Sequence, residues 1–134
     1  MTAQYGRVHD QKRFAQVEET IVWQAMFPGG AMANCNTSYG YNYDGLHAVA
    51  DNGFFELSPA ISYGPFKGRT GDGELHFPDI NQQAAQLDGI GKLILENKPL
   101  PDHISGNEGL RDLHVIEAIY NAANSGGKVN VTYT

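Results

Sequence analysis

Residues 17–30 read VEETIVWQAMFPGG, and this stretch decides the fold. Ile21, Trp23 and Ala25 occupy alternate positions, so their side chains share one face of a β-strand and the residues between them point to the other. The closing Pro-Gly-Gly supplies a turn, because proline fixes φ and glycine accepts positive φ. Residues 31–39 alternate again. The stretch therefore predicts an antiparallel hairpin.

Other strand-like stretches flank this hairpin on both sides. Asp51-Asn52-Gly53 marks a second tight turn, because Asn-Gly tolerates positive φ. Connections this short join antiparallel neighbours. The further strands that the pattern predicts are residues 2–8, 46–50, 54–57, 61–66, 74–77 and 128–133.

The second half of the chain has helical spacing. Residues 81–97 place an apolar stripe on one side of a helix that Pro99 prevents from continuing. Ser105 and Glu108 match a capping box, and the helix that it starts ends at Gly126-Gly127. Strands followed by helices predict an α+β fold, a two-layer sandwich in which an open, mostly antiparallel sheet has helices packed on one face.

Composition and charge narrow the possible functions. The 134 residues fit one domain, and a net charge of −6 with scattered Lys and Arg disfavours nucleic acid as a partner. No apolar run approaches the roughly 20 residues of a membrane helix. The one cysteine, Cys35, cannot form an internal disulfide, and we interpret it as a small buried side chain in a strand.

Dinucleotide binding needs glycines between a strand and a helix whose N-terminal amides face the phosphates. Gly71 and Gly73 precede a predicted strand, and Gly89 and Gly91 lie inside a predicted helix, so neither pair meets that requirement. We expect no cofactor-binding residue in this chain.

The sequence contains only weak candidates for a metal site or for acid–base catalysis. His114 and Glu117 share a helix face at i, i+3, which can hold a metal, but no third ligand can be named. A triad through Asp112 and His114 lacks an identifiable serine. We therefore predict no catalytic and no metal-binding residue.

Tyrosines are the more suggestive residues, because their rings and hydroxyls suit a sugar. Tyr39, Tyr41 and Tyr43 cluster in sequence, and Tyr63 follows. Aromatic side chains are also ordinary strand residues. With helices on one face of the sheet, the other face still carries Val22 and Met26, which predicts a subunit or domain packed there.

Residues 105–120 read SGNEGLRDLHVIEAIY and lead to Gly126-Gly127-Lys128-Val129. This segment resembles the last helix and strand of the glucose-fructose oxidoreductase, inositol dehydrogenase and MocA-like (Gfo/Idh/MocA) oxidoreductase family. FPGGA at 27–31, DNGFFELSPA at 51–60 and NQQAAQLD at 81–88 resemble earlier segments of its C-terminal domain, in family order.

The resemblance implies that residues 1–134 form the C-terminal substrate and oligomerisation domain of an NAD- or NADP-dependent enzyme acting on a sugar, polyol or related compound. The family's N-terminal Rossmann domain, with its catalytic Lys in a Glu-Lys-Pro motif, is not matched in this sequence: Lys98-Pro99 follows Asn97. The resemblance implies homo-oligomers through the free sheet face, and an isolated domain that is inactive. It places one substrate-side residue, Tyr63.

Two other functions stay open at this point. One is a free-standing α+β binding or assembly module, and the other is a small enzyme that uses His114 and Glu117 with a metal. The sequence does not choose among substrates, between NAD and NADP, or among oligomer sizes. Family members occur in the cytoplasm and the periplasm, so the compartment also stays open, and we favour the cytoplasm.

Overall fold

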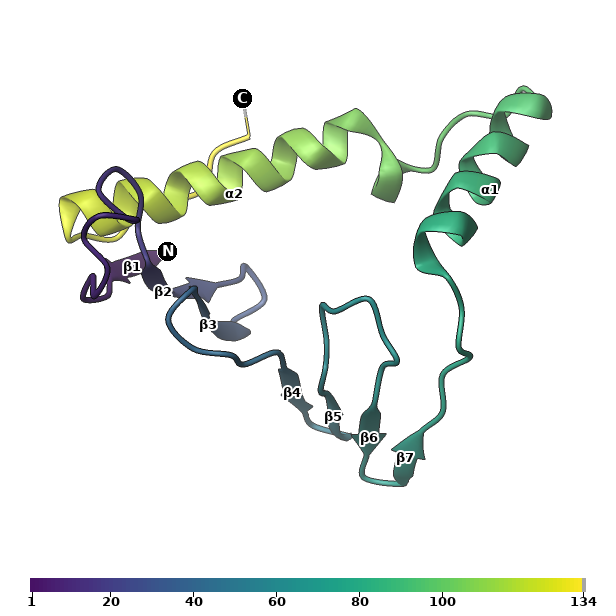
Figure 1. Cartoon of the computed structure of the whole chain (residues 1–134), viewed down its shortest axis with the longest axis horizontal. Coiled ribbons are helices and arrows are strands. Elements are labelled where there is room, and N and C mark those ends of the chain that lie inside the picture. Colours follow the sequence, from purple (N-terminus) through teal and green to yellow (C-terminus); the bar gives the residue numbers. More distant parts are fainter. Residues whose placement is uncertain (134) are drawn as a thin grey trace. The chain divides into compact units, whose positions relative to one another are not determined.

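The computed structural model describes residues 1–133, which fold into two compact units. Unit 1 comprises Met1–Asn42 with Pro101–Thr134, and unit 2 comprises Tyr43–Leu100 (Figure 1). The predicted α+β class and the open antiparallel pairing are confirmed, although one sheet was predicted. The strands form two sheets, of three and four strands, because residues 39–45 join no strand pair.

The sheet of unit 1 has the order β1-β2-β3 and is antiparallel throughout. Its strands are β1 (Thr2–Tyr5), β2 (Thr20–Met26) and β3 (Met32–Ser38). The register places Trp23 opposite Cys35, and the Phe27 N–H donates to the Ala31 carbonyl at 2.9 Å to close the turn. The predicted hairpin is confirmed.

The long helix α2 (Gly106–Ser125) begins as its sequence predicts. The Ser105 Oγ accepts a hydrogen bond from the Glu108 N–H at 3.3 Å, which satisfies one of the free amides of the first turn. The second half of the capping box is absent, because the Glu108 carboxylate accepts from Arg111 at 2.9 Å and the Ser105 N–H donates to the Asp102 carbonyl of the short helix η1 (Asp102–Ile104).

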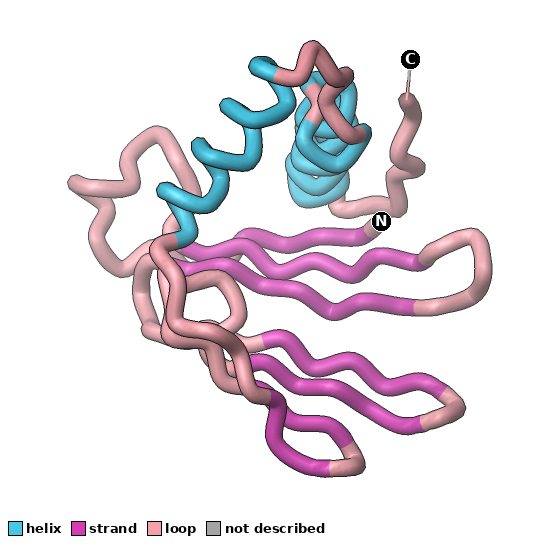
Figure 2. The backbone as a smooth tube through the Cα atoms, turned by 90° about the vertical axis from the view of Figure 1, so that its right-hand side faces the viewer, coloured by secondary structure: helices cyan, strands magenta, loops and turns pink. Residues whose placement is uncertain are grey.

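The core of unit 1 lies between α2 and one face of the sheet. Figure 2 shows the helix along that face, where it contacts β1. The buried apolar side chains are Ile21 and Ala25 of β2 with Ala118, Ile119 and Ala122 of α2. Since three of these five are alanines, the helix and the strands approach closely and the core is small.

The helix ends at Gly126, whose φ of 67° lies in the left-handed region. We expect Gly126→Ala to lower the free energy of unfolding by about 1 kcal/mol, because a Cβ makes this conformation costly. Gly127→Ala is the matched control, since its φ is not positive and a Cβ there would meet nothing closer than the Ser125 Oγ at 3.7 Å. Urea unfolding measures both variants, and equal losses would contradict this account of the helix end.

The opposite face of this sheet carries large apolar side chains in solvent. Val22 is 44% exposed and Met26 is 61% exposed, and Met32 lies opposite Met26 in the register. Amide side chains lie among them, with Gln24 donating to Asn34 at 2.8 Å. The predicted half-apolar free face is therefore present.

Unit 2 contains a four-stranded antiparallel sheet in the order β4-β5-β6-β7. Its strands are β4 (Leu46–Ala50), β5 (Gly53–Leu57), β6 (Gly68–Thr70) and β7 (Gly73–Leu75). The hairpin around Asp51-Asn52 is confirmed. The strand predicted at 61–66 is wrong: these residues form bends and irregular loop, and the pairing partner of β5 comes from the glycine-rich stretch that follows.

Helix α1 (Gln82–Leu95) of unit 2 starts at Asn81, whose side chain accepts from the Ala84 N–H at 3.0 Å. Its predicted apolar stripe is present, but none of its residues is buried. Leu95 is 89% exposed, and Leu87 and Ile94 are also in solvent. The prediction of helices packed on one sheet face therefore holds for α2 within unit 1, and the apolar stripe of α1 stays uncovered.

The last strand predicted, residues 128–133, is also wrong as a strand. The Val129 N–H donates to the Met1 carbonyl at 2.9 Å, and the amino group of Met1 donates to the Val129 carbonyl at 2.6 Å. The pairing is confined to these two residues, which is too little to form a strand, so the segment follows the start of β1 without extending the sheet.

Candidate functional site

The segment that carries Tyr63 joins β5 to β6 in unit 2, and Asp44 fixes its start. The Asp44 Oδ1 accepts hydrogen bonds from the N–H groups of Ala60 and Ile61, each at 2.8 Å. The Ser58 hydroxyl donates to the Asp44 carbonyl at 3.2 Å. Asp44, two residues before β4, therefore holds the start of the loop that carries Tyr63.

Tyr63 lies on the rim of a small recess and is 80% exposed. The recess has a volume of about 140 Å³, and its other lining residues are Gly64, Pro65, Phe66, Phe77, Pro78, Asp79, Ile80 and Gln82. Ligand pockets usually measure about 300–1,000 Å³. This surface can hold only part of a ligand, so it is one wall of a site.

A larger recess of about 470 Å³ adjoins the first, because Phe66 and Phe77 line both. The two rings meet edge to face at 80°, with centroids 6.4 Å apart. The remaining lining residues are mostly polar: Glu56, Ser58, Lys67, Gly68, Arg69, Glu74, Leu75 and His76. Aromatic rings beside planar polar groups suit a polyhydroxy compound, whose C–H face packs on the ring and whose hydroxyls bond the rim.

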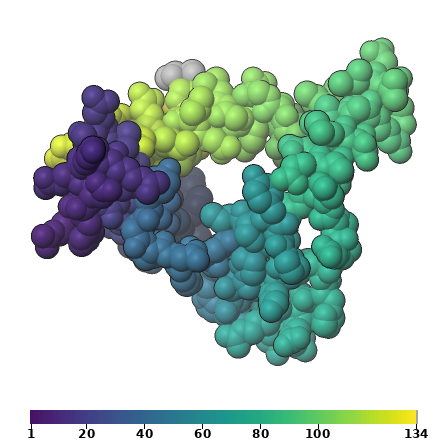
Figure 3. Space-filling view, viewed as in Figure 1, coloured from purple at the N-terminus to yellow at the C-terminus, as the bar shows by residue number. Residues whose placement is uncertain are grey.

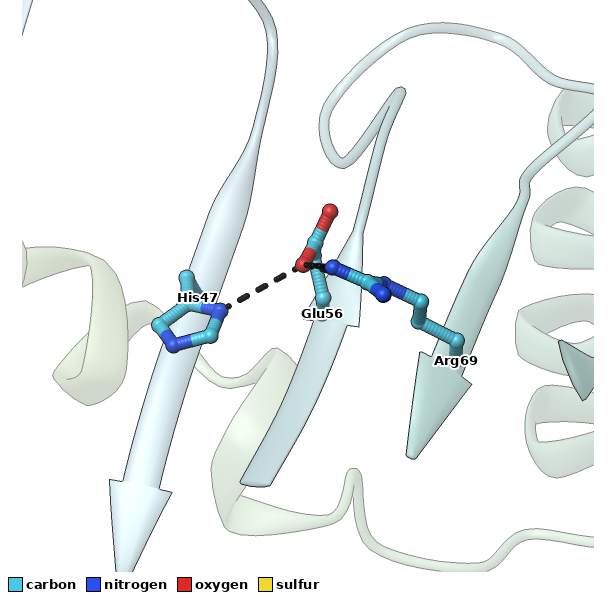
Figure 4. A network of polar contacts seen from close by, with 3 residues as sticks. All are labelled: His47, Glu56 and Arg69. Atoms are coloured by element: carbon cyan, nitrogen blue, oxygen red, sulfur yellow. Dashed lines mark hydrogen bonds and ion pairs between the residues drawn. The ribbon is translucent and has the colours of Figure 1, made fainter. Parts of the chain in front are cut away.

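A row of ionisable side chains crosses the sheet beside this recess (Figure 4). His47, Glu56 and Arg69 lie opposite one another on β4, β5 and β6. The Glu56 Oε2 accepts from the Arg69 Nη2 at 2.9 Å and Nε at 3.2 Å, and the His47 Nδ1 lies 3.5 Å from the same oxygen. The hydrogen bond from Arg69 lowers the pKa of Glu56.

The lowered pKa of Glu56 predicts how the stability of the fold depends on pH. A carboxyl group whose pKa is lowered by folding contributes stability above its unfolded pKa, and this contribution is lost as the pH falls through the folded pKa. We expect Arg69→Gln to raise the pKa of Glu56 toward the ordinary carboxyl range, measured by NMR of the side-chain carboxyl carbon. Lys67→Gln is the control, since Lys67 lines the recess without bonding Glu56. An unchanged Glu56 pKa in the Arg69 variant would contradict the assignment.

This row favours binding over acid–base chemistry. A carboxylate that is held ionised by Arg69 and is open to solvent is a weak proton acceptor at neutral pH. The site therefore offers a ligand polar contacts and charged groups. Neither Glu56 nor Arg69 was predicted from the sequence. Counting back from the Asn-Gly turn does place His47 opposite Glu56.

No family model matches the chain. Among solved structures, the chain is similar to the crystal structure of aldose-aldose oxidoreductase from Caulobacter crescentus complexed with glycerol. The two are 35% identical, the likeness covers 94% of this chain, and the TM-score is 0.84. The chain belongs to the Gfo/Idh/MocA oxidoreductase family. It spans 39% of the length of that neighbour.

The other residues considered from the sequence do not form a reactive centre in this Gfo/Idh/MocA domain. His114 Nδ1 and Glu117 Oε2 are 3.9 Å apart, and the His114 ring packs edge to face on Tyr133 at 6.1 Å. Within residues 1–133, no three His, Cys, Asp or Glu side chains converge as metal ligands would. Burial raises the pKa of the Cys35 thiol, so Cys35 is not an activated thiolate.

Of the other tyrosines in the sequence cluster of this Gfo/Idh/MocA domain, Tyr39 and Tyr41 make local contacts, whereas Tyr43 is largely exposed. The Tyr41 hydroxyl donates to Asn36 Oδ1 at 2.5 Å, and the Tyr39 ring packs against Phe14 at 5.5 Å, both within unit 1. Gly71 and Gly73 flank the β6–β7 turn, and Gly89 and Gly91 lie within α1. Neither α1 nor α2, in the part of the chain described, has the length and hydropathy of a membrane-spanning helix.

Proposed function

We propose that this chain is the C-terminal, substrate-side domain of an NAD(P)-dependent oxidoreductase acting on a sugar, a polyol or a related compound. The observation that carries the proposal is the likeness to aldose-aldose oxidoreductase, which extends over 94% of this chain but over 39% of the neighbour. The dinucleotide-binding Rossmann domain belongs to a part of the protein outside these 134 residues.

The size and openness of the candidate site support a substrate site that this chain forms on one side and another domain forms on the other. The Tyr63 recess is too small to enclose a sugar, and the recess beside it is lined by exposed charged groups. In the complete enzyme, a nicotinamide cofactor held outside this chain would supply hydride chemistry, and the residues of this chain would orient the substrate and exclude water. Tyr63 contacts the substrate from the sheet side.

The exposed apolar side chains of α1 support the proposal that a further domain packs against this chain. Leu87, Ile94 and Leu95 of α1 are largely exposed, and no other element of unit 2 packs on this helix in the part of the chain described. Soluble proteins rarely leave a row of this kind exposed, because covering it is favourable by about 25 cal/mol per Å². A further domain of the same protein is the cover that the family implies.

The free face of the unit 1 sheet is the oligomer interface in this proposal. Val22, Met26 and Met32 supply its apolar part, and Gln24 and Asn34 supply hydrogen-bonding groups between them. Val22→Glu places a charge in the middle of that face, so it shifts the complete protein toward monomer in sedimentation velocity. Val17→Glu, at an exposed residue outside the strand, is the matched control. A monomeric wild-type protein would remove the interface from the proposal.

Calorimetric titration of the isolated chain with NADH and NADPH tests the absence of a cofactor site. We expect no saturable heat, because no helix N-terminus follows a glycine-rich turn after a strand in residues 1–133. Micromolar binding of either cofactor would overturn the proposal. A stop codon in frame immediately upstream of the gene segment would favour the free-standing module instead.

Kinetics of the protein encoded by the complete reading frame test the role of Tyr63. We expect Tyr63→Ala to raise the KM for an aldose about tenfold and to leave the Kd for the cofactor unchanged, because the residue contacts the sugar alone. Tyr43→Ala is the control, since Tyr43 is 70% exposed, against 80% for Tyr63, but does not line the recess. Unchanged kinetics in the Tyr63 variant would remove it from the site.

A further inference from the structure

A third recess lies in unit 1, apart from the residues assigned to substrate. It has a volume of about 490 Å³ and lies where the end of β1, the segment before β2 and the C-terminal half of α2 meet. In the space-filling view the N-terminal residues lie against the C-terminal turns of α2 (Figure 3). Its lining residues are Tyr5, Gly6, Val8, Phe14, Ala15, Gln16, Val17, Glu18 and Tyr120.

Three aromatic rings dominate this recess. The Tyr5 and Tyr120 rings are tilted by 36° with their centroids 6.5 Å apart, and Phe14 lines the recess from the loop. The Tyr5 hydroxyl donates to Asn124 Oδ1 at 3.0 Å, which fixes that ring against α2. The face of an aromatic ring carries negative potential, so rings held in this way attract a cation.

The charge of the recess has a single sign. Glu18 is its one acidic residue, and no Lys, Arg or His is among the residues that line it. The Tyr120 hydroxyl donates to the Glu18 Oε1 at 2.7 Å, which fixes the carboxylate. This hydrogen bond raises the pKa of Tyr120, so the phenol is neutral at neutral pH and the formal charge is that of Glu18.

The same aromatic group already holds one cation of the chain. The Arg13 guanidinium carbon lies 5.3 Å from the centroid of the Phe14 ring and 5.9 Å from that of Tyr39. Phe14 lines the recess and Tyr39 does not, and Arg13 itself is not among the lining residues. One ring of the recess, that of Phe14, therefore already packs against an organic cation of the chain.

We propose that the recess bounded by Tyr5, Phe14, Glu18 and Tyr120 binds an organic cation of the ammonium or guanidinium class. The rings surround the apolar part of such a group, and Glu18 neutralises its charge. The net charge of −6 on the chain favours the approach of a cation from solution. The site is independent of the oxidoreductase function and needs no other domain.

Choline and its uncharged isostere 3,3-dimethyl-1-butanol form a matched pair of probes. The chain is titrated with each at constant ionic strength, and amide NMR shifts are followed at the lining residues. We expect saturable shifts with choline and at least tenfold weaker binding of the alcohol, because only the charge differs. Methylammonium and guanidinium, titrated in the same way, distinguish the two classes of cation.

Two variants connect the binding to the proposed residues. Glu18→Gln keeps an acceptor for the Tyr120 hydroxyl but removes the charge, and we expect it to weaken choline binding about tenfold. Asp88→Asn removes an exposed charge of α1 in unit 2 and is expected to leave choline binding unchanged. Equal binding of choline and the alcohol, full affinity in the Glu18 variant, or no saturable shift at the recess would overturn the proposal.

Discussion

Replacing Ile21 by alanine is expected to lower the free energy of unfolding by about 3 kcal/mol, because a buried Ile→Ala change loses apolar contact and leaves a cavity. Ile21 is 3% exposed and is one of two β2 side chains that pack in the core of unit 1. Three of the five core side chains are alanines, which are too short to reach into the space that the change leaves. Urea unfolding followed by circular dichroism measures the loss as a lower transition midpoint.

Val22→Ala is the matched control for this experiment. Val22 is the next residue of the same strand, and its side chain lies on the free face. We expect a loss below about 1 kcal/mol, because half-exposed methyl groups contribute less. The assignment of the two sheet faces would be wrong if Val22→Ala cost as much as Ile21→Ala in the isolated chain.

The second large effect concerns Glu19, which is 5% exposed. Its Oε2 accepts hydrogen bonds from the N–H groups of His9 at 2.7 Å and Asp10 at 3.2 Å, and so holds the loop between β1 and β2 closed. Glu19→Ala leaves these amides without their partner, at a cost of about 2 kcal/mol. We expect trypsin to cleave after Lys12 and Arg13 at least tenfold faster in this variant.

Two controls separate loop closure from charge. Glu19→Gln retains a side-chain oxygen as acceptor and is expected to be cleaved only slightly faster than the wild type. Glu18→Ala removes the adjacent carboxylate, which bonds Tyr120 and not the loop amides. The account fails if Glu19→Ala and Glu18→Ala are cleaved at the same rate.

The sequence predicted those features that depend on local chemistry. Residues 17–39 form a hairpin because strand alternation and a Pro-Gly-Gly turn agree, and the Asp51-Asn52-Gly53 turn sets the β4–β5 register. Ser105 and Gly126 mark the ends of α2 because a side-chain cap and a left-handed residue are both required there. Each signal lies within a few residues of the feature that it determines.

Features that depend on distant pairing could not be predicted. Arg69 meets Glu56 only because β6 pairs with β5, and Gly68–Thr70 is a three-residue strand of low β-propensity that pattern alone assigns to a loop. The aromatic recess joins Tyr5 and Glu18 to Tyr120, which lies 102 residues after Glu18 in the chain. The segment at 61–66 has strand-like composition, but it pairs with no strand of either sheet.

The discontinuity of unit 1 bears on the order in which the protein forms during translation. Its sheet is complete once Ser38 has left the ribosome, whereas α2, which seals it, is synthesised after all of Tyr43–Leu100. Neighbouring hairpins close quickly and long loops close slowly, so the nascent chain carries an open β-sheet while the intervening segment emerges. Arrested ribosome complexes that end before Gly106 should therefore expose Ile21 and Ala25 to chaperones, and release from arrest after Ser125 should end that exposure.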